Sequence, residues 1–167
     1  RHAAHWPAIR ATAAERVWSA GCATGEEAFS IALVLPAARV LATDVAASAL
    51  HVARGGVVRR SQLEKLSPAD RKLLRPDGHV ASEVLGRIDF RVHNLVRDDF
   101  ASGFDLIVCR NVLVYMEPLF RARVVARFAE ALVPGGLLLL GSVDRVLPVS
   151  VGLRREEQGG VVFLRRP

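Results

Sequence analysis

Residues 17–35 read VWSAGCATGEEAFSIALVL, and we expect the rest of the chain to be built around them. A short β-prone run comes first and ends at Ala20. Gly21 and Gly25 then permit a tight turn with close backbone approach, and Glu26 opens an apolar helix. In an open α/β sheet the binding crevice lies beyond the carboxyl ends of the strands, and the first strand-to-helix turn forms its floor. We therefore expect a ligand to lie against this turn.

The composition of the turn restricts the kind of ligand. Its two glycines do not follow the Gly-x-Gly-x-x-Gly spacing, which disfavours a dinucleotide fold that binds a pyrophosphate. Glu26 and Glu27 would repel a phosphate at the start of the helix, and they interact favourably with the helix dipole themselves. A cationic or hydroxyl-bearing ligand fits the turn better.

The overall composition indicates one α/β domain, residues 1–167, with 51% hydrophobic content and a sizeable core. The net charge of +6 suggests acidic partners, but the arginines are scattered. A solvated face is therefore the favoured interpretation, and nucleic acid is not expected. No apolar run approaches the ~20 residues that cross a bilayer, and nothing resembles a signal peptide. We expect a cytoplasmic monomer without membrane insertion.

The cysteines and histidines point to no metal or redox chemistry. Cys22 and Cys109 are too few for a disulfide framework and too far apart for a zinc site, and the sequence has no paired metal-ligand spacing. We expect two reduced thiols and no bound metal. The five histidines are interpreted as ordinary surface or core residues.

A second buried strand is predicted over residues 39–43, followed by Asp44 and then by a helix over residues 46–54. Asp44 lies about twenty residues past the glycine turn, where an acidic side chain can accept hydrogen bonds from both hydroxyls of a ribose. The alternative is a helix cap or a surface carboxylate. The nearby glycine turn favours the ribose interpretation.

Residues 57–86 have no sheet pattern and are predicted to form an insertion in the strand–helix alternation. Residues 61–66 and 67–74 are predicted to be short helices, the second with a serine cap and a proline in its first position. Pro76-Asp77-Gly78 predicts a turn, and the polar stretch after it a small hairpin. Substrate recognition and a decorated surface loop are both compatible with such an insertion.

Polar residues gather at the ends of two further predicted strands, residues 87–93 and 104–109. If the strands are parallel, these polar residues share one sheet edge with the glycine turn. They are Asn94, Arg110, Asn111 and Tyr115, together with Asp44. Each of them alone is better explained as a loop residue, but jointly they favour a site.

The last third of the chain is predicted to complete the sheet. A helix over residues 118–132 would turn Phe120 and Phe128 toward the core, and a Pro-Gly-Gly turn would lead into a strand over residues 137–142. An antiparallel hairpin is predicted to close the sheet at one edge, with strands 151–155 and 161–165 around residues 156–160. The strand at residue 16 is expected beside the strand at residue 104, with the crevice between their carboxyl ends.

These motifs together resemble the catalytic domain of the CheR-type chemotaxis receptor methyltransferases, which use S-adenosylmethionine. The resemblance covers nearly all of the chain. It rests on the run 16–31, Ala42-Thr43-Asp44, Leu66-Ser67-Pro68, Asn94-Leu95 and, most specifically, FDLIVCRNVLVY at residues 104–115. It implies a Rossmann-like class I methyltransferase sheet, mostly parallel, with a C-terminal antiparallel hairpin and a small inserted subdomain.

The resemblance also implies roles for individual residues. The implied cofactor-binding residues are Arg1, Gly21, Glu27, Asp44, Asn94, Leu95, Arg110 and Asn111. The implied catalytic residues are Arg1 and Tyr115, which would flank the reactive methyl group. Arg1 corresponds to the arginine of the family's Phe-Phe-Arg motif. Its role, and the choice of Glu27 over Glu26, rest on the resemblance alone.

The chain departs from the family pattern at several points that bear on substrate recognition. The family's amino-terminal helical subdomain is absent from the 167 residues, Val58 replaces a usual tyrosine, and Ser142-Val143-Asp144 replaces a familiar Ser-Glu pair. Arg1 would sit at a frayed terminus, where packing seldom fixes a side chain. Because misplacement by ~1 Å can slow a displacement reaction ~10²-fold, we expect this chain to bind cofactor but to methylate receptor helices poorly.

Three functions compete at this point. The leading one is S-adenosyl-L-methionine-dependent O-methylation of glutamate side chains on cytoplasmic helices of methyl-accepting chemotaxis receptors, with S-adenosyl-L-homocysteine as the product. A glutamate with a pKa near ~4.3 is ionised at neutral pH, so this reaction needs no general base. The second is a catalytically weak or inactive cofactor-binding module of a signalling protein. The third is a nucleic-acid methyltransferase, which only the basic composition supports.

Overall fold

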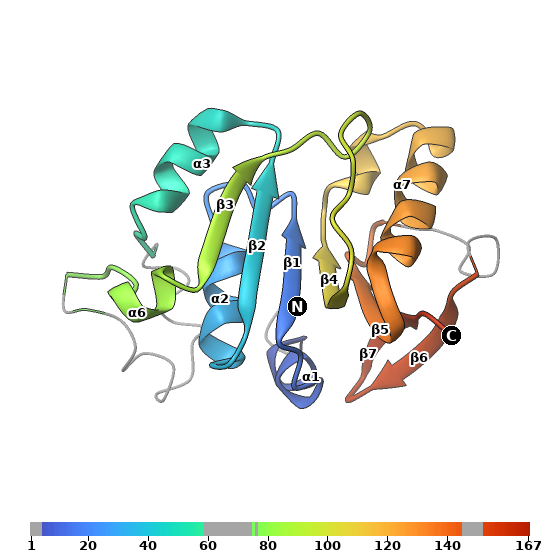
Figure 1. Cartoon of the computed structure of the whole chain (residues 1–167), viewed down its shortest axis with the longest axis horizontal. Coiled ribbons are helices and arrows are strands. Elements are labelled where there is room, and N and C mark those ends of the chain that lie inside the picture. Colours follow the sequence, from blue (N-terminus) through green and yellow to red (C-terminus); the bar gives the residue numbers. More distant parts are fainter. Residues whose placement is uncertain (1–4, 59–74, 76, 145–151) are drawn as a thin grey trace.

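Strands alternate with helices along the chain, as the sequence predicts (Figure 1). The computed structural model describes residues 5–58, 75, 77–144 and 152–167. Its helices are α1 (His5–Ala11), α2 (Glu26–Val34), α3 (Ala47–Arg54), α6 (Ser82–Leu85), the 3-10 helix η1 (Leu113–Tyr115) and α7 (Pro118–Ala131). Its strands are β1 (Arg16–Ala20), β2 (Arg39–Asp44), β3 (Ile88–Val92), β4 (Phe104–Cys109), β5 (Leu132–Leu140), β6 (Arg154–Gln158) and β7 (Val161–Arg165).

The described strands form one seven-stranded sheet in the order β3-β2-β1-β4-β5-β7-β6. The pairs from β3 to β5 are parallel, whereas β7 is antiparallel to both β5 and β6. The predicted order is confirmed, because β1 lies between β2 and β4 and the C-terminal hairpin forms one edge. The carboxyl ends of β1, β2, β3 and β4 consequently meet at one side of the sheet.

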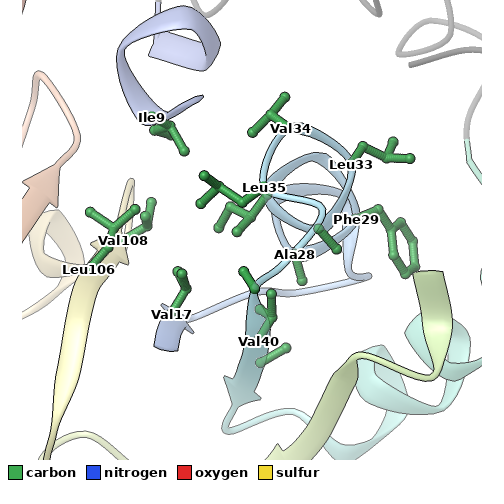
Figure 2. Close-up of a cluster of buried hydrophobic side chains, with 14 of the residues drawn as sticks. Ile9, Val17, Ala28, Phe29, Leu33, Val34, Leu35, Val40, Leu106 and Val108 are labelled. Atoms are coloured by element: carbon green, nitrogen blue, oxygen red, sulfur yellow. The ribbon is translucent and has the colours of Figure 1, made fainter. Parts of the chain in front are cut away.

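One face of the sheet packs against α1 and α2. Figure 2 shows Ile9 of α1 and Leu35 next to α2 approaching Val17 and Val108 of the sheet. These side chains are buried, as is Phe29 on α2. Most residues of α2 are buried, so its hydrophobic side chains need not be confined to one face of the helix, as they would be in a surface helix.

The opposite face packs against α7 and surrounds one tryptophan. Trp18 has no exposed surface, and its ring contacts Phe100, Phe104 and Phe128 at centroid distances of 4.8, 5.4 and 5.3 Å. Its indole N–H donates to Thr43 Oγ1 at 2.9 Å, which satisfies a polar group that burial would otherwise leave without water. This bond ties β1 to β2 immediately before the strand ends that carry the glycine turn and Asp44.

Three local predictions are wrong. Phe120 is 37% exposed rather than buried, because the core contacts of α7 begin only at Val124. The predicted Pro-Gly-Gly turn belongs to β5, where the register shifts between Phe104 and Leu106 and the strand bulges. After Gly78, His79 forms an antiparallel bridge with the distant Val57, and the helix α6 follows from Ser82, so the stretch does not fold back on itself as a hairpin.

The C-terminal hairpin is also tighter than predicted. Its turn is Gly159-Gly160 alone, because both glycines adopt positive φ, at 55° and 76°, and so close a two-residue loop. The two helices predicted over residues 61–74 lie outside the described residues. Among the described helices, none is both long and apolar enough to cross a membrane.

Candidate functional site

The glycine turn after β1 lies directly against the loop after β4. Gly21 adopts a φ of 82°, and its N–H donates to the carbonyl of Thr43 at 2.7 Å. A Cβ at this position would come within 2.3 Å of Val112 Cγ2. Only glycine therefore permits both the left-handed backbone and the close approach of the two loops. The predicted turn is confirmed, and its packing against Val112 was not predicted.

Asp44 connects the glycine turn to the start of α3. Its Oδ2 accepts the N–H of Ala23 and its Oδ1 accepts the N–H of Ala46, both at 2.9 Å. Asp44 is not the helix cap that the sequence left open, because the N-cap of α3 is Ala46 and no side chain caps the helix; the bond from Ala46 instead closes the turn that leads into α3. Each carboxylate oxygen has a second lone pair, so Asp44 can still accept hydrogen bonds from a diol. Asp44 is partly exposed, so a ligand can reach its carboxylate.

A cavity of about 360 Å³ lies beyond the carboxyl ends of β1 to β4. Its walls combine one carboxylate, two carboxamides and one imidazole with apolar side chains, which is the composition of a small-molecule site. The lining residues are Gly21, Ala23, Asp44, Val45, His93, Asn94, Leu95, Asn111, Val112, Tyr115 and Met116. The structure thus brings together six of the predicted site residues from four separate segments.

The segment after β3 is held in a tight turn. The side-chain oxygen of Asn94 accepts the N–H of Val96 at 2.9 Å, and the N–H of Asn94 donates to Asp98 Oδ2 at 2.7 Å. Leu95 is buried, and its carbonyl accepts a hydrogen bond from Arg127 on α7. These contacts fix the backbone of Asn94 and Leu95 where they line the cavity.

His93 is a cavity residue that sequence reasoning missed. Its ring meets the edge of Trp18 at 5.5 Å, and its Nε2 lies 3.1 Å from the carbonyl oxygen of Asp99. His93 directly follows β3 and precedes Asn94, which was a predicted site residue. This position in the sequence could have identified His93 as a site residue. Met116 and Val112 were missed because apolar residues in loops carry no comparable signal.

A second carboxylate, that of Asp144, binds the backbone of the loop after β4. In the sequence, Asp144 stood out only as part of a departure from the family pattern, and no role was predicted for it. Its Oδ2 accepts the N–H of Asn111 at 2.6 Å, and its Oδ1 accepts the N–H of Val114 at 2.8 Å. Asp144 is 3% exposed. Asn111 has a φ of 60°, a left-handed conformation that asparagine tolerates better than most residues.

Glu27 and Arg110 do not line the cavity but pair with each other beside it. The carboxylate of Glu27 accepts a hydrogen bond from Ser19 Oγ at 2.9 Å and lies 3.5 Å from Arg110 Nη1. The side chains of the pair are 16% and 8% exposed. Burial raises the pKa of Glu27, and the charge of Arg110 opposes this rise. The pair joins the start of α2 to the end of β4.

The nearby thiols are unsuited to nucleophilic chemistry. Burial, reinforced by the charge of Asp44, raises the pKa of Cys22 to about 12. Burial likewise raises the pKa of Cys109. Both residues are free, buried cysteines, so each thiol stays protonated at neutral pH.

Tyr115 stands at the mouth of the cavity and is 86% exposed. It is the last residue of η1, whose start is fixed by the bond from Val114 to Asp144. An exposed tyrosine on a short, tied helix can contact a ligand in the cavity and a molecule outside it. Arg1, the other predicted catalytic residue, lies outside the described residues, so its role stays a prediction.

The site suits a ligand that combines hydroxyl groups with an apolar part. Asp44 offers acceptor capacity for hydroxyls, Leu95 and Met116 offer apolar surface, and glycine permits close approach of the backbone. A phosphate is disfavoured, because Glu26 and Glu27 occupy the first turn of α2. The sheet order, the glycine turn and the acidic residue at the end of β2 define a class I S-adenosyl-L-methionine-dependent methyltransferase fold.

Comparison with known proteins refines this class. Residues 4–156 match the family described as CheR methyltransferase, SAM binding domain. The chemotaxis protein methyltransferase of Listeria monocytogenes is 36% identical over 149 residues, which are 83% of this chain and 57% of that protein. The chemotaxis protein methyltransferase of Escherichia coli K12 is 33% identical over 164 residues, 84% of this chain and 57% of that protein.

The chain belongs to the CheR methyltransferase family, and its cofactor is S-adenosyl-L-methionine. It spans little more than half the length of the two curated relatives. Its fold is also similar to that of a TehB-like SAM-dependent methyltransferase from Corynebacterium glutamicum, with a TM-score of 0.62 and 18% identity. That alignment covers 98% of this chain and 84% of the other.

Proposed function

We propose that this chain transfers the methyl group of S-adenosyl-L-methionine to glutamate side chains on the helices of chemotaxis receptors, which gives glutamyl methyl esters. The observation that carries the proposal is the single cavity that unites Asp44, Asn94 and Asn111 with the exposed Tyr115. The two relatives from Listeria monocytogenes and Escherichia coli are chemotaxis protein methyltransferases, which supports a methyltransferase that acts in chemotaxis. The glutamate acceptor is our inference from the family resemblance and the chemistry of the site.

Cofactor binding is assigned to residues at the strand ends. Asp44 accepts hydrogen bonds from the ribose hydroxyls, and the glycine turn at Gly21 lets the backbone approach the ligand closely. Asn94, Leu95 and Asn111 supply the remaining walls. Glu27 and Arg110 act indirectly, because their ion pair holds the start of α2 against the end of β4.

The chemistry requires alignment more than acid–base assistance. S-adenosyl-L-methionine held against Asp44 and the loop after β4 would supply an electrophilic methyl group for the acceptor oxygen, and S-adenosyl-L-homocysteine would leave as the product. A glutamate acceptor is already ionised at neutral pH, so the protein need not remove a proton. Tyr115 orients the acceptor at the mouth of the cavity, so its contribution is alignment rather than proton transfer.

The acceptor is expected to be an acidic segment of a partner protein. The chain carries a net charge of +6, which favours encounter with a carboxylate-rich surface. The partners we propose are the receptor's methyl-accepting helices in the cytoplasm.

The experiment combines calorimetric titration with S-adenosyl-L-homocysteine and transfer of radiolabelled methyl groups to a receptor fragment. We expect binding together with slow transfer, and label that alkali releases as methanol from the glutamyl esters. A receptor fragment whose acceptor glutamates are replaced by alanine is the matched control and should take up no label.

The outcomes separate the competing functions. Binding of the cofactor product without any transfer would favour a cofactor-binding module of a signalling protein. Label that survives alkali, or that enters the control fragment equally, would contradict glutamate O-methylation.

A further inference from the structure

We propose that Asp144 is a positioning residue of the cofactor site. Its carboxylate holds both ends of the short loop that carries Asn111 and Tyr115, the two residues of that loop that face the cavity with polar groups. The inference depends on cofactor binding and not on the acceptor of the proposed function. Failure of receptor methylation would therefore leave it testable.

Three backbone N–H groups converge on this one side chain. Asn111 and Val114 donate at 2.6 and 2.8 Å, and Gly141 donates at 3.2 Å. The first two belong to the loop after β4 and the third to the end of β5, so Asp144 joins two neighbouring strand ends. A carboxylate suits this position because it only accepts hydrogen bonds, whereas an amide would turn one NH₂ group toward N–H donors.

The bond also explains the local backbone. Asn111 is held at a φ of 60°, and the N–H that donates to Asp144 is its own. Val114 is the second residue of η1, and Tyr115 is the third. The bond from the N–H of Val114 to Asp144 therefore also positions Tyr115. Without these bonds two partly buried backbone N–H groups would lose their acceptor, and the loop would move to find others.

Gly141 makes the approach possible. A Cβ on Gly141 would lie 2.5 Å from Asp144 Oδ2 and 2.9 Å from the backbone nitrogen of Asn111. Its φ is not in the left-handed region, so the absence of a side chain matters here for space rather than for backbone conformation. Gly141→Ala therefore displaces the carboxylate without removing it and gives a second, independent perturbation of the same contact.

The chain offers a matched control in Asp105. Its Oδ2 also accepts two backbone N–H groups, from Glu15 at 3.0 Å and from Arg16 at 2.8 Å. Asp105 is the second residue of β4, at the end opposite to Asn111, and it does not line the cavity. Asp105→Asn and Asp144→Asn thus disturb similar bonds, but only the second lies behind the cofactor site.

The test measures the Kd for S-adenosyl-L-homocysteine and the unfolding midpoint of the two variants and of the wild type. We expect Asp144→Asn to raise the Kd about tenfold, the effect of losing one charge-assisted hydrogen bond, while Asp105→Asn changes it less than about twofold. Both variants should unfold more easily. Amide hydrogen exchange at Asn111 and Val114 should accelerate in Asp144→Asn only.

Gly141→Ala keeps the proposal testable if Asp144→Asn does not fold. Gly141→Ala should also raise the Kd. In the double variant with Asp144→Asn, the fold increase in Kd should be smaller than the product of the two single-variant increases, because both substitutions disturb the same contact. An unchanged Kd in folded Asp144→Asn, or an equal rise in Asp105→Asn, would overturn the positioning role. So would an unchanged Kd in Gly141→Ala.

Discussion

Replacement of Gly21 by alanine tests whether the contact between the two loops shapes the site. The substitution forces a residue with a Cβ to adopt a φ of 82°, which costs roughly 1–2 kcal/mol. It also drives that Cβ to 2.3 Å from Val112 Cγ2, and overpacking of this kind costs about 1–3 kcal/mol. We therefore expect a loss of about 2–5 kcal/mol in the free energy of unfolding, measured by urea denaturation.

Gly78 provides a control with the same backbone and no contact. Its φ is 81°, and a Cβ there would meet nothing within 4 Å. Gly78→Ala should therefore lose only the backbone part, about 1–2 kcal/mol. The difference between the two variants measures the contact with Val112, and Gly21→Ala should also weaken binding of S-adenosyl-L-homocysteine because Val112 lines the cavity. Equal losses in the two variants would refute the overpacking argument.

Three further predictions concern other parts of the molecule. Asp44→Ala should weaken binding of S-adenosyl-L-homocysteine by roughly 1–3 kcal/mol in calorimetry, and an unchanged Kd in a folded variant would remove Asp44 from the ribose site. Thr43→Val should cost about 1–3 kcal/mol of stability in urea unfolding, because the buried indole N–H of Trp18 loses its acceptor; a loss below ~0.5 kcal/mol would contradict this. The bonds from Arg165 lower the pKa of Glu156 to about 2, so their stabilisation is present above the unfolded-state pKa near 4.5 and is lost as the pH falls toward 2. Glu156→Gln should therefore melt at a lower temperature than the wild type at pH 7, and at the same temperature near pH 2. The difference in stability at pH 7 should be less than about 1 kcal/mol, because the pair is about one-third exposed. A difference that grows on acidification would refute the assignment.

The sequence by itself determined the strands and the residues that end them. β1, β4 and the turn at Gly21 follow from short apolar runs bounded by glycine or polar residues, which are local signals. Parallel strands that alternate with helices must bring their carboxyl ends to one side. The placement of Asp44, Asn94 and Asn111 on one edge was therefore predictable, although the resemblance to a family was needed to name the cofactor.

Only the tertiary structure decided which polar residues face the cavity and which support it from behind. Glu27 was predicted to bind cofactor, and that role stays a prediction; its contacts with Ser19 and Arg110 are visible only in the structure, because Arg110 lies far away in the sequence. Asp144 is joined to Asn111 across 33 positions, and no local pattern encodes such a bond. Local sequence fixes backbone propensity and strand ends, but the partner of a buried charge depends on how distant segments pack.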